Sequence, residues 1–508
     1  MCVYRQSGRF RDESLFCLLL FICAKNVIGD VMVKFSNSYM KNCNYVLEKL
    51  RPEDNYDIIV KEIEIGGRKS MLFCITGLIK DEMFDITMQY LNRITQTDIE
   101  KAGDTESFMR HFSTYVSSMT EEKADDFITA ILTGAIAILI DGYKKGIVID
   151  CRNYPARNVQ EPESDKVLRG SHEGFVESIV INTALIRKKV RSTDLTMERY
   201  RIGSESKTDV VLCYMDNKVN QKELSILRKK LKEIKVKSLS MSHESLRECL
   251  IPEQVWNPFP KIRYTERPDA AATCIADGNI IILTDGSPTV MISPTGIFDF
   301  VQDINDYYFS PVIGTMLRFL RVNVFAVSLL FIPLWYLFVI LYKENLPDSL
   351  MFMAIEEEYT VPVIVQLFIV EFVIDALRLA SLNTPSALSN SFSVVGALVL
   401  GEFAVKSGWF VSEVVLFMAF VTISNFVQPS YELGYSIKIF RTLILFLTAI
   451  LKGTGFIIGL GITVLVICFT KTVFGYTYLY PLIPFNKTAL KNLIIRRSIN
   501  FKEKSPPG

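Results

Sequence analysis

Two acidic residues inside an apolar stretch are the side chains in this sequence with the clearest potential for chemistry. Glu371 and Asp375 lie four residues apart within 361–377, so a helix presents both on one face. Arg378 follows at the edge of that face. Ionisable groups at membrane depth are costly and usually face a cavity, a partner or water. The spacing therefore indicates an ion passage or, alternatively, an interfacial helix in which Asp375 pairs with Arg378 and Glu371 reaches the lipid headgroups.

A third acid, Glu402, lies in the apolar stretch 392–405, four residues before Lys406. The simplest interpretation is a salt bridge within one helix. In an oligomer, one such acid per subunit would instead form a ring that favours cations. We therefore take Glu371, Asp375 and Glu402 as the candidate ion-pathway residues.

The motifs of enzymes are missing from the sequence. It contains no Walker loop, HExxH, GxSxG or dinucleotide fingerprint, and its three histidines are scattered through polar surroundings. The ten cysteines form no CxxC pair, which favours free thiols in a reducing compartment. A net charge of +1 argues against nucleic acid as a partner. We predict a protein that is not an enzyme, with no metal and no cofactor.

The apolar residues are concentrated in the C-terminal half of the chain. Residues 322–342 carry no charge and are long enough to span a bilayer. Arg318 and Arg321 precede them and an acidic stretch follows, so the positive-inside rule places the N-terminal half in the cytoplasm. Further apolar segments cover 361–377, 392–405, 414–427 and 443–469, the last interrupted at 452–455.

These segments predict a transmembrane domain over 311–485, followed by a basic tail, 486–508, that is also cytoplasmic. Both ends of the domain then lie on one side, so the number of crossings is even. We predict four, plus a re-entrant or interfacial segment. Gly455, Gly459 and Gly461 have the spacing of close helix contacts.

The N-terminal half contains a predicted repeat. A strand pair, a helical region and a hairpin follow one another at 57–76, 82–131 and 135–150, and the same order recurs at 197–215, 221–250 and 280–292. An Asp-Gly turn marks each second hairpin, although such turns also arise by convergence. The predicted fold is an α+β soluble half made of two related α/β subdomains, 31–151 and 152–310 with its linker, followed by an all-α transmembrane bundle.

The first 30 residues are predicted to be an extension outside this fold. Three arginines precede the apolar run 15–24, which is the layout of a signal peptide. That run is too short to span a bilayer, and no clean cleavage site follows it.

Several strings of the soluble half resemble the A subunit of GerA-type spore germinant receptors. They are 169–175 (RGSHEGF), 182–187 (NTALIR), 264–269 (YTERPD) and 285–288 (DGSP). The strings 381–385 (SLNTP), 428–433 (QPSYEL) and 484–486 (PFN) look most like the stage V sporulation protein AF branch of that family.

The resemblance implies a germination protein of the endospore inner membrane. It implies A subunits that assemble as homo-oligomers, with a pentamer suggested, into a channel releasing monovalent cations, and other germination membrane proteins as partners. Candidate subunit or subdomain contacts within the matching strings are Arg169, Glu173, Arg267, Asp269 and Asp285.

Two hypotheses follow. The first is a subunit of an oligomeric ion channel; the second is a non-conducting scaffold that docks a ligand or other germination proteins. A purely structural role for the string 264–269 is also open, because Arg267-Pro268-Asp269 can begin a helix with Asp269 in its first turn.

Overall fold

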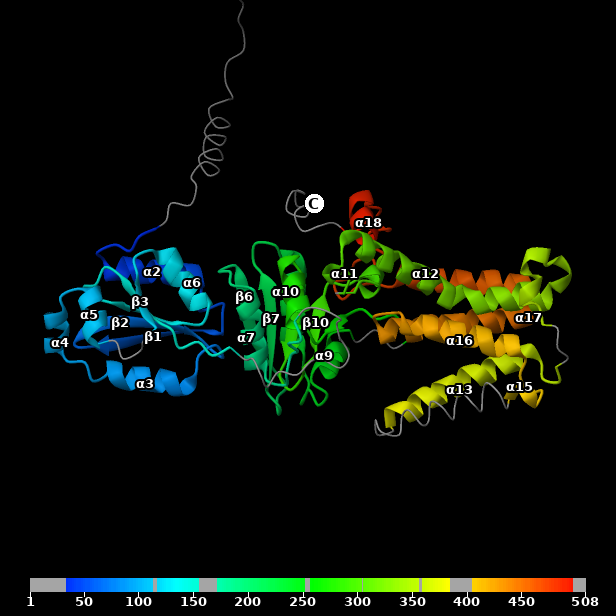
Figure 1. Cartoon of the computed structure of the whole chain (residues 1–508), viewed down its shortest axis with the longest axis horizontal. Helices are drawn as coiled ribbons and strands as arrows, with labels where there is room; N and C mark the ends of the chain where they lie inside the picture. The colour runs from blue at the N-terminus through cyan, green and yellow to red at the C-terminus, as the bar shows by residue number, and fades with distance from the viewer. Residues whose placement is uncertain are drawn as a thin grey trace, which may run out of the picture. The chain divides into compact units, whose positions relative to one another are not determined.

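A computed structural model describes residues 33–112, 117–154, 171–251, 256–303, 305–355, 359–383 and 404–496 (Figure 1). The predicted extension 1–30 and the residues Arg169 and Glu402 lie outside these ranges. The chain divides into two compact units, which we describe separately. The first comprises 1–158 and 183–198, and the second comprises 159–182 and 199–508.

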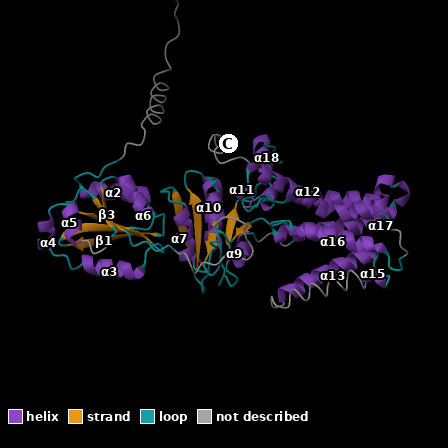
Figure 2. Cartoon of the chain, in the orientation of Figure 1, coloured by secondary structure: helices purple, strands orange, loops and turns teal. Residues whose placement is uncertain are grey.

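The first unit contains a five-stranded sheet covered by helices on both faces (Figure 2). Its strands lie in the order β1-β2-β4-β5-β3, and all neighbours are antiparallel. They are β1 (Ile58–Ile65), β2 (Arg68–Ile75), β3 (Ser118–Glu121), β4 (Ile136–Ile140) and β5 (Gly146–Ile149).

Two groups of helices cover the two faces of this sheet. On one face Phe73 packs with α2 (Tyr39–Leu50) and α6 (Ala124–Leu132). On the other face Leu72 and Cys74 pack with α3 (Asp81–Leu91), α4 (Gln96–Ala102) and α5 (Thr105–Phe112). Because successive side chains of a strand point to opposite faces, burial on both faces explains why β4 is a continuous apolar run.

A second sheet repeats the strand order of the first, as β6-β7-β9-β10-β8. Its strands are β6 (Leu195–Ile202), β7 (Thr208–Met215), β8 (Arg263–Thr265), β9 (Ile280–Thr284) and β10 (Val290–Ser293). The associated helices are α8 (Gln221–Glu233), α9 (His243–Leu250) and α10 (Pro268–Ala276). Helix α7 (Ile179–Lys189) precedes β6, and its residues from Thr183 onward belong to the first unit. The shared order of five strands is what the predicted duplication requires.

The sequence-based prediction missed β3 and β8, each the third strand of its sheet along the chain. Each is a short edge strand, and β3 falls within the stretch 82–131 that we expected to be helical. Strands of three or four residues show too little alternation to be recognised.

The C-terminal half is mostly helical. It contains η1 (Ile297–Phe300), α11 (Asn305–Tyr308), α12 (Pro311–Trp335), the π-helical turn η2 (Tyr336–Leu341), η3 (Lys343–Asn345), η4 (Asp348–Met353), α13 (Val363–Asn383), α15 (Ala404–Lys406), α16 (Ser412–Phe426), α17 (Tyr431–Phe469) and α18 (Lys487–Ile494). Within the described residues, two helical stretches are long and apolar enough to cross a membrane: Pro311–Leu341 and Tyr431–Phe469.

Helix α17 is folded back on itself at Lys452, whose backbone is not helical. A Cβ at Gly455 would lie 1.9 Å from the carbonyl oxygen of Leu447, and a Cβ at Gly459 would lie 2.9 Å from the Cα of Ile444. In a straight helix Ile444 and Gly459 would be about 22 Å apart, at 1.5 Å per residue. The two halves of α17 therefore form an antiparallel hairpin.

The hairpin defines two ends of the helix bundle. At the base, next to the second sheet, the Ser436 hydroxyl donates to the carbonyl of Pro258 at 2.5 Å, and Asn257 donates to Thr470 at 2.7 Å. At the distal end, Gly453 lies beside the hydroxyl of Tyr342, 3.5 Å from where its Cβ would be. The prediction that 443–469 forms one interrupted span is thus wrong, because the helix begins at Tyr431 and reverses at its interruption.

The glycines of the hairpin provide a matched test of this packing. Gly455→Ala places a methyl group against backbone that cannot move easily, which costs about 1–3 kcal/mol of stability. Gly461→Ala is the control, since nothing lies within 4 Å of its Cβ position. We expect a lower thermal unfolding midpoint in detergent for Gly455→Ala alone. Equal midpoints for the two variants would contradict the hairpin.

Candidate functional site

The two acids of α13 form ion pairs with two basic residues of α17. Arg441 donates to both carboxylate oxygens of Glu371, at 2.6 and 2.8 Å. Lys438 lies 3.1 Å from Glu371 and also pairs with Asp375. We call these four residues the bundle charge cluster. Two negative and two positive charges make it neutral as a whole.

Because the bundle charge cluster is mostly buried, its positive and negative charges must balance in the folded chain. Arg441 is 3% exposed, Lys438 14% and Glu371 17%. Removing one partner from such a pair leaves an uncompensated charge in apolar surroundings, which costs about 3–5 kcal/mol. Arg441 also donates to the carbonyl of Ser328 in α12, at 3.3 Å. The bundle charge cluster therefore joins α12, α13 and α17.

Asp375 is the most exposed member of the bundle charge cluster. Its side chain is 37% exposed, although it pairs with Lys438. One turn further along α13, the Arg378 guanidinium lies over the ring of Tyr435 in α17, 5.3 Å from its centre. The cluster thus leads from a buried Arg441–Glu371 pair to an acid at the surface of the chain.

Lys438 and Arg441 are the residues that sequence reasoning missed. We expected this helix to begin at Leu443, which left both residues outside it, whereas α17 begins at Tyr431. The sequence did contain a signal for this pairing. Lys438 and Arg441 are three residues apart and Glu371 and Asp375 are four apart, so each pair lies on one face of its helix and the two pairs can face each other.

A second charged group joins the second sheet to the start of the helical half. Arg267 is fully buried and donates to Asp269 at 2.6 and 3.1 Å, and to the carbonyl of Ser171 at 2.9 Å. Tyr308 of α11 donates a short hydrogen bond to the same Asp269 carboxylate. Burial by itself would raise the pKa of Asp269, but the hydrogen bonds from Arg267 and Tyr308 outweigh it and the pKa is lowered.

The structural role of the string 264–269 is also seen. Helix α10 begins at Pro268, and Asp269 in its first turn accepts a hydrogen bond from the amide of Ala270, as the sequence indicated. Arg267 and Asp269 therefore contact each other and α11 within one unit. Their predicted role in contacts between subunits stays a prediction.

The remaining candidate contacts are placed separately. The Glu173 carboxylate accepts a hydrogen bond from the Ser171 hydroxyl at 3.4 Å, and Asp285 accepts one from the amide of Ile179, at the start of α7, at 3.2 Å. Arg169 and Glu402 lie outside the described residues. Among the residues that are described, no group of three or more His, Cys, Asp or Glu side chains is arranged to hold a metal ion.

A third charged group lies at the base of the bundle. Asp306 is fully buried and accepts hydrogen bonds from Arg318 at 3.2 Å and Arg321 at 2.8 Å. Arg318 also donates to the carbonyl of Leu493 in α18, at 3.1 Å. We expected Arg318 and Arg321 to flank the first apolar helix, but they lie inside α12, which begins at Pro311.

Comparison with known proteins gives one consistent result along the chain. The family model described as Bacillus/Clostridium GerA spore germination protein matches residues 45–507. Stage V sporulation protein AF of Bacillus subtilis (strain 168) is 34% identical over 459 residues, covering 90% of this chain and 92% of that protein. Spore germination protein KA of the same organism is 27% identical and covers 89% and 83%.

Two further similarities were found. The uncharacterized membrane protein YfkQ of Bacillus subtilis (strain 168) is 30% identical, covering 87% of this chain and 85% of that protein. The N-terminal domain of the A subunit of the Bacillus megaterium spore germinant receptor GerK3, a crystal structure, aligns with 52% of this chain and 97% of its own, with 24% identity and a TM-score of 0.40.

The buried pair of the bundle charge cluster can be tested by a double-mutant cycle. Glu371→Gln and Arg441→Gln should each lower the free energy of unfolding by about 3 kcal/mol, since each leaves a buried charge unpaired. The double variant should cost less than the sum. Glu82→Gln, whose salt bridge with Lys80 is exposed, is the control and should cost less than about 1 kcal/mol. Additive effects at Glu371 and Arg441 would contradict the pair.

The Asp269 contacts predict a dependence on pH. Because the folded pKa lies below the unfolded value of about 3.9, the contribution of Asp269 to stability is complete above that value. It is lost as the pH falls through the folded pKa. Asp269→Asn should lower the unfolding midpoint at neutral pH and flatten its decline in acid. Asp277→Asn, exposed at the other end of α10, is the control; identical acid profiles for both variants would contradict this role.

Proposed function

The chain belongs to the GerA family of Bacillus/Clostridium spore germination proteins, and on that basis we propose that it is a subunit of an oligomeric membrane complex that passes monovalent cations during germination. The family is one of membrane proteins that act in sporulation and germination with other germination proteins. Conduction, the oligomer and the site of the passage are the parts that we propose.

The exposed side of Asp375 is the observation that supports the proposal most directly. A carboxylate that is 37% exposed on a mostly apolar helix is unfavourable in lipid, because ionisable groups at that depth need a partner or water. A second copy of the chain, with water between the copies, supplies such surroundings. The passage would then lie between subunits, and Asp375 would face it, with Glu371 holding the α13 helix in place. Glu402 stays a candidate for the same passage.

Exposed aromatic residues at both ends of the bundle support its place in the membrane. Tyr431 and Tyr435 lie at the base and are 68% and 42% exposed; Tyr342 and Trp409 lie at the distal end and are 40% and 67% exposed. Tyr and Trp are enriched where a membrane meets water. Each half of the α17 hairpin is about 25–30 Å long, which suits the hydrocarbon core.

The basic residues at the base support a cytoplasmic side. The tail contacts α12 there: Arg318 donates to the carbonyl of Leu493 in α18 at 3.1 Å, and the amide of Arg496, just after α18, donates to the Thr315 hydroxyl at 3.1 Å. Together with Lys487 and Lys491, this end is rich in positive charge. We therefore place the soluble half and the tail in the spore core.

The alternative function is a scaffold that conducts no ions and docks a ligand or other germination proteins. One specific observation favours it: the bundle charge cluster is neutral within a single chain, so no second copy is needed to balance Glu371 or Asp375. Under this alternative, both acids only hold α13 against α17.

Potassium flux from liposomes distinguishes the two functions. We expect the reconstituted protein to release K⁺, and Asp375→Asn to reduce the flux or its preference for cations over anions several-fold, because the charge facing the passage is lost. Asp348→Asn, an exposed acid in the distal connection, is the control and should behave like the unmodified chain.

One result would contradict the channel, and another would contradict the role of Asp375 in it. Liposomes with the unmodified protein that retain K⁺ as well as empty ones would favour the scaffold. Unchanged flux and selectivity in Asp375→Asn would remove this acid from the passage.

A further inference from the structure

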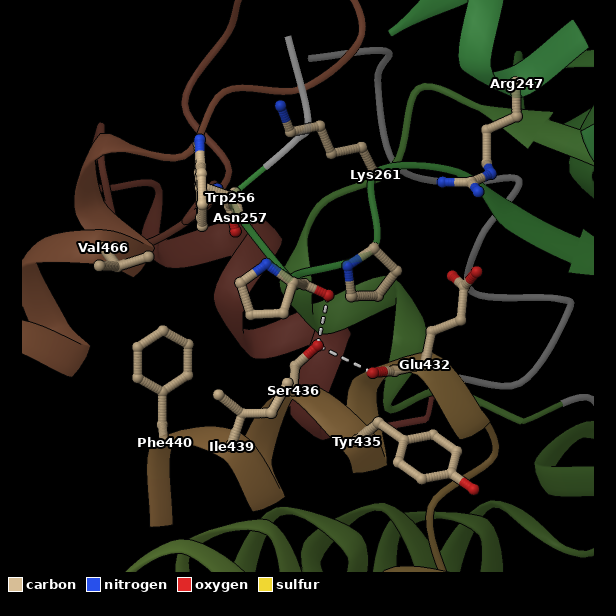
Figure 3. A pocket seen from close by; sticks show the side chains of 12 residues that line it. Arg247, Trp256, Asn257, Lys261, Glu432, Tyr435, Ser436, Ile439, Phe440 and Val466 are labelled. Carbon is tan, nitrogen blue, oxygen red and sulfur yellow. Dashed lines mark hydrogen bonds between the residues drawn. The ribbon is translucent and has the colours of Figure 1, made fainter. Parts of the chain in front are cut away.

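A cavity of about 680 Å³ lies at the base of the bundle, where the second sheet's subdomain meets the α17 hairpin (Figure 3). One part of its wall comes from the connection between α9 and β8, and includes Trp256 and Lys261. Another part comes from the first turns of α17, and Val466 adds the returning half of the hairpin. The cavity is thus formed by elements that are distant in sequence.

The wall of this cavity has a charged side and an apolar side. Arg247, Lys261 and Glu432 are on the charged side. Figure 3 shows the Glu432 carboxylate directed toward Arg247 and the Lys261 ammonium directed the other way, toward Trp256. Ile439, Phe440 and Val466 are on the apolar side. Ile439 is 53% exposed, so the apolar side continues onto the outer surface of the bundle. A ligand that matches this wall has a charged head and an apolar tail.

Aromatic residues at the rim place the cavity at the level of a membrane surface. Trp256 is 94% exposed, and Tyr435 is 42% exposed. An exposed indole has no stabilising contact in water but is favoured among lipid headgroups. This argument depends on the proposed position of the bundle in the membrane.

We propose that this cavity binds the headgroup of an aminophospholipid, with its acyl chains along Ile439 and Val466. The phosphate would lie against Lys261, and the primary amine against Glu432. Basic pockets at the cytoplasmic ends of membrane helices are suited to lipid headgroups, and charged hydrogen bonds to phosphate are strong.

The Glu432 carboxylate is the reason to favour a headgroup with both charges. A purely anionic headgroup would bring its phosphate close to this acid, which is repulsive. Arg247 is already bound to Glu244 at 2.8 Å, so it cannot serve Glu432 and a phosphate equally. A headgroup that carries its own ammonium group supplies the missing positive charge.

Quenching of tryptophan fluorescence by brominated lipids tests the proposal on the full chain. The protein is placed in phosphatidylcholine nanodiscs, and phosphatidylethanolamine with brominated acyl chains is titrated in. The signal from Trp256 is the difference between the unmodified chain and Trp256→Phe. We expect phosphatidylethanolamine to quench Trp256 at a lower fraction than brominated phosphatidylcholine or phosphatidylglycerol does.

Three variants make the test specific. Lys261→Gln and Glu432→Gln should each weaken the effect of phosphatidylethanolamine about tenfold, the loss of one charge-assisted hydrogen bond. Lys229→Gln, an exposed lysine of α8 outside the cavity, should leave it unchanged. The two cavity variants change different parts of the headgroup contact. If one of them fails to fold, the quenching measured with the other still tests the proposal.

The contrary outcomes are distinct. Equal quenching by all three brominated lipids, or no effect of either cavity variant, would overturn the lipid site. A stronger effect of phosphatidylglycerol would overturn the role of Glu432. Displacement of the lipid by an equal concentration of soluble phosphoethanolamine would assign the cavity to a soluble ligand and overturn the lipid assignment. No quenching by any lipid would overturn the lipid site together with the membrane position, whereas a failure of K⁺ flux alone would leave the lipid site standing.

Discussion

A charged side chain inside an apolar bundle must have an opposite charge within hydrogen-bond distance, and this constraint fixes how α13 packs on α17. Arg441 is almost fully buried, and Glu371 binds it through both carboxylate oxygens. Apolar helix surfaces in lipid gain little from one contact over another, so they define the register of two helices weakly. A paired charge defines it strongly, because any shift leaves the charge alone. Since Arg441 also binds Ser328, one guanidinium orders three helices.

The same requirement explains the position of the other two charged groups. Asp306 with its two arginines, and Arg267 with Asp269 and Tyr308, both lie where the second sheet's subdomain continues into the helices. Each group is buried and each joins elements distant in the chain. Helix α11 therefore contacts the second sheet's subdomain through Tyr308 and α12 through Asp306.

Close contact at glycine has the complementary role in the hairpin. Gly455 and Gly459 let the two halves of α17 approach to backbone contact, and Gly461, in the same run, faces open space. This folding back brings Val466 beside Phe440 and completes the cavity at the base. The geometry that determines the bundle thus also brings charged and apolar groups together at this cavity.

The sequence by itself determined the features that depend on local pattern: the membership of the family, the repeat of strands, the apolar half, and the start of α10 at Pro268. These follow from strings, alternation and turn residues that are neighbours in the chain. It could not determine the partners of Glu371 and Asp375, because Lys438 and Arg441 are more than sixty residues away in the chain. In addition, the predicted helix began at residue 443, after both of these bases. The reversal at Lys452 was also missed, since the apolar run 443–469 is long enough to be taken as one interrupted span. Only tertiary structure decides such questions, because pairing of buried charges and contact between helices depend on distance in space and not on order in the chain.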